Sequence, residues 1–260
     1  MDARTSRYHD VYARSMRDPE GFWREAAQAI DWIEPPKKIF DKDAGIYGRW
    51  FTGATCNTCY NAIDRHVERG RADQVAIIHD SPVTSSVTKL TYRELLAEVN
   101  AFASVLQDFG VTKGDRVILY MPMVLEALIA MYACARIGAV HGVVFGGFAA
   151  KELATRIDDA KPKLVLSASC GIEVARIVPY KPLLDAAIEL AAHKPDACII
   201  LQRLQETCAL TPGRDHDWAP LRARAIADKK TVACVPVAAT GTQSAVFFAV
   251  TALSRNVAQS

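Results

Sequence analysis

The feature that most constrains the fold of this chain is a regular alternation of short apolar segments and amphipathic segments in its second half. The apolar segments have strand length, the others have helix length, and together they run 116–120, 125–137, 139–145, 151–159, 164–168, 183–192 and 197–201. Parallel strands need a crossover between them, which is usually a helix. The order therefore predicts an α/β fold with a doubly wound, mostly parallel sheet and helices on both faces.

The N-terminal segment differs from this pattern because it carries many aromatic side chains among charges. Asp18 and Pro19 suit the N-cap and first position of a helix, which should end before Pro35. Such a segment can bury little apolar surface alone. We expect an aromatic-rich helical arm over residues 1–56, a larger domain over 57–239 and a divergent tail over 240–260.

Local signals fix several boundaries within the larger domain. Thr91 and Glu94 form a capping box that predicts a helix start, and Gly110 should end that helix. Residues 80–89 are polar and indicate a loop or hairpin connection. Residues 213–218 are also polar, and we expect a surface loop there, followed by a helix.

Charge and composition exclude several classes of protein. The 31 basic and 29 acidic residues give a net charge of +2, which offers no electrostatic case for nucleic acid or an anionic membrane. No apolar run reaches the roughly 18 residues of a spanning helix. Residues 1–4 lack the apolar core of a secretory signal, and the seven cysteines are scattered. We expect a cytoplasmic protein with reduced thiols.

The block with most information about a site is residues 143–148 (VVFGGF), where an apolar strand runs into Gly146 and Gly147. Glycines at the carboxyl end of a strand let a ligand come close, although a plain strand–helix turn has the same appearance. A dinucleotide-binding GxGxxG motif does not occur, which disfavours a nicotinamide-dependent enzyme. Arg176 is either a contact for an anionic ligand or a solvated charge.

Cysteine and histidine patterns indicate structural roles. The Cys56-x-x-Cys59 pair has no second ligand pair at a spacing typical of zinc sites, so two buried or half-buried thiols are the favoured interpretation. His66, His79 and His141 are isolated, and no orienting partner follows from the sequence. Hydrolase GxSxG, metalloprotease HExxH and P-loop motifs are not found in the sequence.

Several segments in order resemble the acetyl- and propionyl-CoA synthetases of the adenylate-forming superfamily, over about residues 7–239. They include PEGFW at 19–23, NTCYNAIDRH at 57–66, LTYREL at 90–95, GDRV at 114–117, YMPM at 120–123, ARIGAVH at 135–141 and VPYKPLLD at 178–185. The last of these is similar to the propionyl branch in particular.

The resemblance implies an enzyme that makes an acyl-AMP from a short carboxylic acid and ATP with Mg²⁺, and then transfers the acyl group to CoA. By position it assigns contacts with the nucleotide part of CoA to Phe145, Gly146, Gly147 and Arg176. A second arginine that is common in the acetate branch falls on Glu173. No catalytic residue and no protein metal ligand is assigned.

The resemblance stops after Ala239. The family continues there with a Ser/Thr/Gly-rich loop that wraps the ATP phosphates, whereas this chain reads TGTQSAVFF from Thr240. We expect a truncated form, without the ATP loop and the C-terminal domain, that is inactive alone. The tail is hypothesised to be frame-shifted, which translation of the other two reading frames tests.

Three interpretations remain open at this stage. The first is the N-terminal part of a propionate–CoA ligase. The second is a non-catalytic module derived from such an enzyme, which binds CoA or contacts a full-length homologue. The third is a fragment of an acetate–CoA ligase.

Overall fold

The computed structural model describes residues 6–146, 149–173 and 176–239. The tail at 240–260, including the hypothesised frame-shifted segment, lies outside these residues. The described chain forms two compact units, one from residues 6–57 with 236–239 and one from residues 58–235. No helix within the described ranges is long and apolar enough to cross a membrane.

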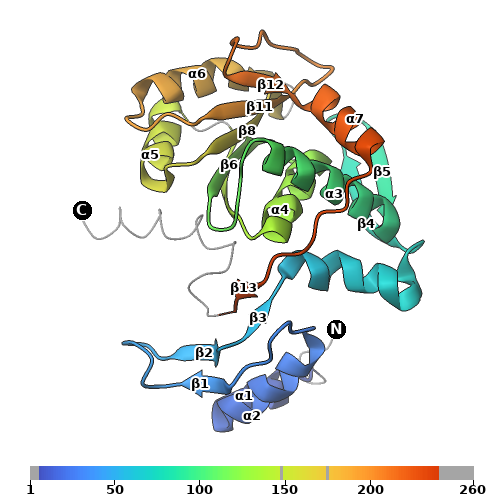
Figure 1. Ribbon diagram of the computed structural model, residues 1–260, viewed down its shortest axis with the longest axis vertical. Helices are drawn as coiled ribbons and strands as arrows, with labels where there is room; N and C mark the ends of the chain where they lie inside the picture. The colour runs from blue at the N-terminus through green and yellow to red at the C-terminus, as the bar shows by residue number, and fades with distance from the viewer. Residues whose placement is uncertain (1–5, 147–148, 174–175, 240–260) are drawn as a thin grey trace. The chain divides into compact units, whose positions relative to one another are not determined.

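The larger unit is built on a five-stranded sheet whose neighbouring strands all run parallel (Figure 1). The strand order is β12-β11-β8-β6-β7. Their bounds are β6 Arg116–Met121, β7 Val140–Phe145, β8 Leu164–Ala168, β11 Ala197–Leu201 and β12 Asp215–Asp217. The α/β prediction with a parallel sheet is therefore confirmed.

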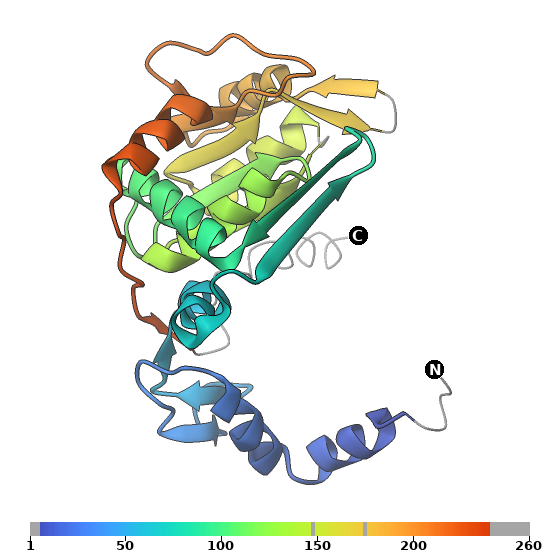
Figure 2. The same ribbon diagram turned by 90° about the vertical axis from the view of Figure 1, so that its right-hand side faces the viewer.

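Helices cover both faces of this sheet (Figures 1 and 2). One face carries α3 (Tyr92–Asp108), α4 (Leu125–Ile137) and α7 (Trp218–Asp228), and the other carries α5 (Ala150–Ala160) and α6 (Tyr180–Leu190). Alternation along β6 explains the two layers: Leu119 joins the first core, whereas Ile118 and Tyr120 join the second. Because β6 is buried on both faces, its residues 117–121 are apolar without alternation.

Caps fix helix ends where the sequence predicted them. The Thr91 hydroxyl accepts a hydrogen bond from the Glu94 amide at 3.3 Å, and the Glu94 carboxylate accepts one from the Thr91 amide at 2.8 Å. Gly110 directly follows the C-cap Phe109 of α3 and has a positive φ of 72°, in the left-handed region that glycine adopts readily. Gly138 ends α4 in the same way, with a φ of 73°.

Residues 213–218 correct the sequence analysis, because the expected surface loop contains the edge strand β12. Its backbone pairs with β11, and this pairing does not require apolar side chains. Asp215 is buried there beside Lys181 and Arg214. Part of the polar pattern comes from these ion pairs of Asp215, and part from Asp217, which caps α7 by accepting a hydrogen bond from the Ala219 amide at 2.9 Å. Periodicity does not distinguish such residues from exposed charges.

The larger unit also contains two helical turns and two hairpins outside the parallel sheet. Helical turns with π-type hydrogen bonding include Tyr60–Asp64 and Val67–Arg71. The residues around 80–89 form an antiparallel hairpin of β4 (Val75–Ser81) and β5 (Ser86–Thr91). A second hairpin, β9 (Cys170–Glu173) with β10 (Arg176–Pro179), lies between β8 and α6.

The smaller unit is held by aromatic packing. It contains helices α1 (Tyr8–Arg17), α2 (Pro19–Ala26) and η2 (Ala27–Ala29), and strands β1 (Lys38–Asp41), β2 (Arg49–Thr52), β3 (Thr55–Cys56) and β13 (Val237–Ala238). The Asp18 carboxylate accepts a hydrogen bond from the Gly21 amide at 2.9 Å, as an N-cap should. The Trp50 ring lies 4.7 Å from Phe40 and 6.2 Å from Trp23.

Candidate functional site

The candidate site lies at the carboxyl ends of the central strands. Because β6, β7 and β8 are parallel, these ends meet at one edge of the sheet, where ligands of open α/β sheets bind. The last residue of β7, Phe145, pairs with Met121 of β6, and Gly146 follows it directly. The β9–β10 hairpin begins just after β8 ends, so the topology brings it to the same edge.

One aromatic ring joins these two parts. A Cβ atom added at Gly146 would lie 1.9 Å from the Tyr180 hydroxyl oxygen, and one at Gly171 would lie 2.5 Å from the same atom. Tyr180 is buried, and its ring packs 4.9 Å from that of Tyr120. Burial raises the pKa of Tyr180 to about 12, with a contribution from Tyr120, so the phenol stays neutral.

This contact explains why residue 146 is a glycine without any need for a ligand, because a larger side chain would collide with Tyr180. Sequence reasoning weighed a ligand against a plain turn and did not consider Tyr180. The only signal was the YKP sequence at 180–182, which the resemblance to the propionyl branch included. Gly146 and Gly171 are therefore both small because Tyr180 lies against them.

Arg176 lies on β10 with 75% of its side chain exposed. It pairs across the hairpin with Glu173, and its guanidinium nitrogen lies 2.9 Å from the carboxylate. Gly171 belongs to the same hairpin as Arg176 and lies against the Tyr180 ring, and Gly146 lies against that ring as well. Gly147, the fourth assigned residue, lies outside the described residues, and Phe145 is placed here by its backbone alone.

A network of ion pairs connects α6 to the edge strand β12. The Lys181 ammonium lies 3.0 Å from Asp215 and 2.5 Å from Asp185, and Arg214 donates to Asp215 at 2.6 Å. Burial raises the pKa of Asp215, but hydrogen bonds from Arg214, Thr211 and Lys181 outweigh this and lower it to about 2. The network couples the start of α6, and hence Tyr180, to the edge strand β12.

The histidines singled out in the sequence do not gather at this edge as a catalytic group. His141 is buried in β7, and burial lowers its pKa to about 4, so the ring is neutral. Its Nδ1 atom has no hydrogen-bond partner within the described residues. His79 contacts the Met123 carbonyl at 3.3 Å, and the His66 ring packs 4.8 Å from Tyr92.

Sequence comparison places the chain among known proteins. The family described as AMP-binding enzyme matches residues 63–241, and the family described as acetyl-coenzyme A synthetase N-terminus matches residues 8–62. The human "Acyl-CoA synthetase short-chain family member 3, mitochondrial" is 47% identical over 89% of this chain and 33% of its own length. The "Propionate--CoA ligase" of Escherichia coli is 46% identical over 87% of this chain and 36% of its own length.

The fold comparison agrees with the sequence comparison. "Acetoacetyl-CoA Synthetase from Streptomyces lividans" superposes with a TM-score of 0.74 and 22% sequence identity, over 86% of this chain and 33% of that one. At this identity the likeness establishes the fold. The chain spans about a third of the length of these relatives. It belongs to the AMP-binding enzyme family, as an N-terminal portion of an acetyl-CoA synthetase-like enzyme.

Proposed function

We propose that the chain is the N-terminal part of a short-chain acyl-CoA synthetase that converts propionate, ATP and CoA to propionyl-CoA, AMP and diphosphate. The observation that carries this proposal is the exposed guanidinium of Arg176. Its hairpin packs through Gly171 against the Tyr180 ring, which also packs against Gly146. The identity to a propionate–CoA ligase supports the choice of acid. The human relative is named mitochondrial, and the cytoplasmic location of this chain stays a prediction.

Arg176 fits the nucleotide part of CoA, whereas Glu173 beside it does not. When bound, CoA supplies the thiol that accepts the acyl group. Arg176 would hold a phosphate of CoA, because an exposed guanidinium can pair with two phosphate oxygens. By the resemblance, Phe145, Gly146 and Gly147 would also contact this part of CoA. Glu173 opposes this binding, since its carboxylate occupies Arg176 and repels a phosphate.

Calorimetric titration of the 260-residue polypeptide with CoA tests this assignment. We expect weak binding that Arg176→Ala abolishes and that Glu173→Gln strengthens. Arg224→Ala is the matched control, because Arg224 is also an exposed arginine at 2.9 Å from a carboxylate, that of Asp108 on α3. Equal loss of binding in both arginine variants, or unchanged binding in Arg176→Ala, would exclude Arg176 from the site.

The ATP-dependent half of the reaction concerns residues that follow Ala239 in the family. In the family that this chain resembles, a Ser/Thr/Gly-rich loop holds the ATP phosphates, and residues 240–260 read differently. We propose that the 260-residue polypeptide alone does not complete the reaction. Sustained formation of AMP from propionate, ATP and CoA by this polypeptide would contradict the proposal.

A second candidate function is a non-catalytic module that binds CoA or contacts a full-length homologue. The partial fit of the CoA surface supports this module. A third candidate, a fragment of an acetate–CoA ligase, is disfavoured by Glu173, because the acetate branch commonly has an arginine at that position. CoA binding without AMP formation would support the module. Co-purification with a full-length homologue would support the contact, and its absence under conditions that retain CoA binding would exclude it.

A further inference from the structure

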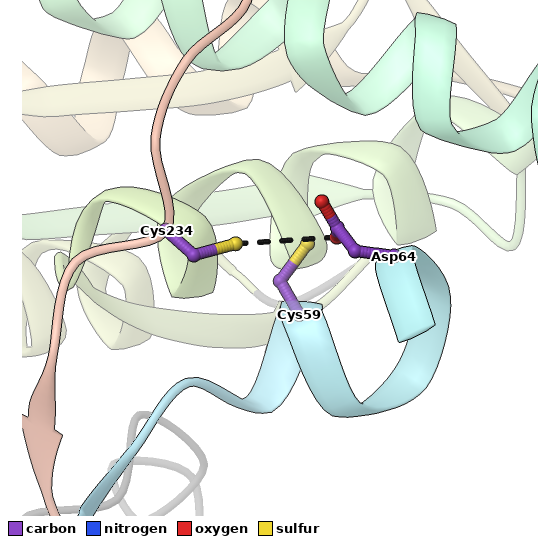
Figure 3. Close-up of side chains that lie close together, drawn as sticks. All are labelled: Cys59, Asp64 and Cys234. Carbon is purple, nitrogen blue, oxygen red and sulfur yellow. Dashed lines mark hydrogen bonds between the residues drawn. The ribbon is translucent and has the colours of Figure 1, made fainter. Parts of the chain in front are cut away.

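A cluster of two thiols and a carboxylate lies in the larger unit, and none of its residues is among those assigned to CoA (Figure 3). Cys59 and Asp64 belong to the helical segment that follows residue 57, and Cys234 belongs to the segment after α7. The two sulfur atoms and a carboxylate oxygen all lie within 4.8 Å of one another. Cys59 is fully buried, whereas Cys234 is half-buried.

The surroundings of the cluster do not suit a metal cation. Arg136 of α4 donates to both carboxylate oxygens of Asp64 at 2.9 Å, and its Nη1 lies 3.6 Å from the Cys59 sulfur. The Arg136 side chain is only 4% exposed, so its charge is poorly screened and would repel a cation. A structural zinc site also needs four ligands, and the cluster offers three.

The same surroundings suit a thiolate beside a second thiol. The Cys234 sulfur lies 3.9 Å from the Asp64 carboxylate, to which its thiol donates (Figure 3). The hydrogen bond from Cys59 and the positive charge of Arg136 lower the pKa of Cys234, and together they outweigh burial and the Asp64 charge, which raise it. The hydrogen bond to Cys234, together with burial, raises the pKa of Cys59. Cys234 is thus the nucleophilic and accessible sulfur, and Cys59 is a neutral thiol next to it.

We propose that Cys59 and Cys234 form a redox-sensitive dithiol that hydrogen peroxide converts into an intramolecular disulfide. In the first step the Cys234 thiolate attacks one peroxide oxygen, the O–O bond breaks, and the leaving hydroxide takes a proton to become water. Cys234 is now a sulfenic acid. Cys59 then loses its proton and attacks the Cys234 sulfur, and the S–O bond breaks to release a second water. Two thiols and one peroxide give one disulfide and two waters.

The position of the pair gives the disulfide a structural consequence. Hydrogen bonds from the Val232 amide to Asn100 at 3.0 Å and from the Val235 amide to the Arg136 carbonyl at 2.8 Å hold the segment of Cys234. The covalent loop from 59 to 234 encloses the whole five-stranded sheet. Because cross-linking restricts the unfolded chain, oxidation should raise the melting temperature of the larger unit.

Peptide mapping tests the proposal on the folded 260-residue polypeptide. After treatment with hydrogen peroxide, the remaining thiols are alkylated and the chain is cut with trypsin without reduction. We expect a cross-link between peptides 50–65 and 231–255, and the loss of two of the seven free thiols. Peptide 50–65 contains both Cys56 and Cys59, so two variants identify the partner: Cys56→Ser should keep the cross-link and Cys59→Ser should lose it.

A second measurement, the rate of cross-linking in the wild-type chain, does not depend on whether the variants fold. Wild-type cross-linking should be at least about tenfold faster in the folded chain than in urea, because folding holds the two sulfurs together. Similar rates, or a cross-link that uses Cys56, would overturn the proposal. Zinc that stays bound at one equivalent after dialysis would also overturn it, in favour of a metal site.

Discussion

Replacement of Gly146 by alanine tests the packing that organises the candidate site. The new Cβ would lie 1.9 Å from the Tyr180 hydroxyl oxygen and 2.5 Å from the ring carbon that bears it, although contacts under 3.0 Å are essentially never seen for Cβ atoms. The ring must therefore retreat by about 1 Å, against Tyr120. Overpacking of this kind costs about 1–3 kcal/mol. The backbone of Gly146 has no positive φ, so the cost is purely steric.

Urea unfolding of the single and double variants measures this cost. Tyr180→Ala alone should lose about 3–5 kcal/mol by leaving a cavity. On that background Gly146→Ala should add little, which gives a coupling energy of about 1–3 kcal/mol. Gly213→Ala is the control: its φ of 79° strains alanine, but no atom lies within 4 Å of the added Cβ, so Tyr180→Ala should not rescue it. Equal destabilisation by Gly146→Ala on both backgrounds would refute the reasoning.

Three other changes follow from local contacts. Thr91→Ala removes the capping box of α3 and should lower the free energy of unfolding by about 1 kcal/mol in urea, whereas Thr91→Ser should have little effect. Asp64→Ala leaves the buried Arg136 charge unpaired and should cost about 3–5 kcal/mol, whereas the exposed pair partner Asp73→Ala should cost under about 1 kcal/mol. Because the pKa of His141 falls from its ordinary 6.5 to about 4, the unfolded chain takes up the proton first and stability declines as pH falls through this window. His141→Gln should flatten that part of the stability profile, and an unchanged slope would contradict the assignment.

The parallel sheet was predictable because its central strands are buried on both faces. Residues 197–201 are a continuous apolar run, residues 164–168 are apolar except for the buried Ser167, and the structure has strands at these same residues. Helix ends were predictable where a local device fixes them, as at Thr91 and Gly138. The edge strand β12 was not, since backbone pairing holds it and its side chains are polar.

The candidate site was predictable only in part. The glycine block marked the end of β7, but its partner Tyr180 follows 34 positions after Gly146 in the sequence and meets it through the parallel register of β7, β6 and β8. Arg176 was singled out, but its pairing with Glu173 depends on a hairpin that periodicity did not indicate.

The sequence by itself determined the order of the central strands and the helices between them, and the resemblance to acyl-CoA synthetases, because these properties reside in neighbouring residues. Only the tertiary structure decided which distant side chains meet. Cys56 and Cys59 are close in the sequence, and both thiols are buried or half-buried as expected, but the thiol beside Cys59 in the structure is that of Cys234. The packing of α4, which depends on the whole core, brings the positive charge of Arg136 next to Cys59 and Asp64.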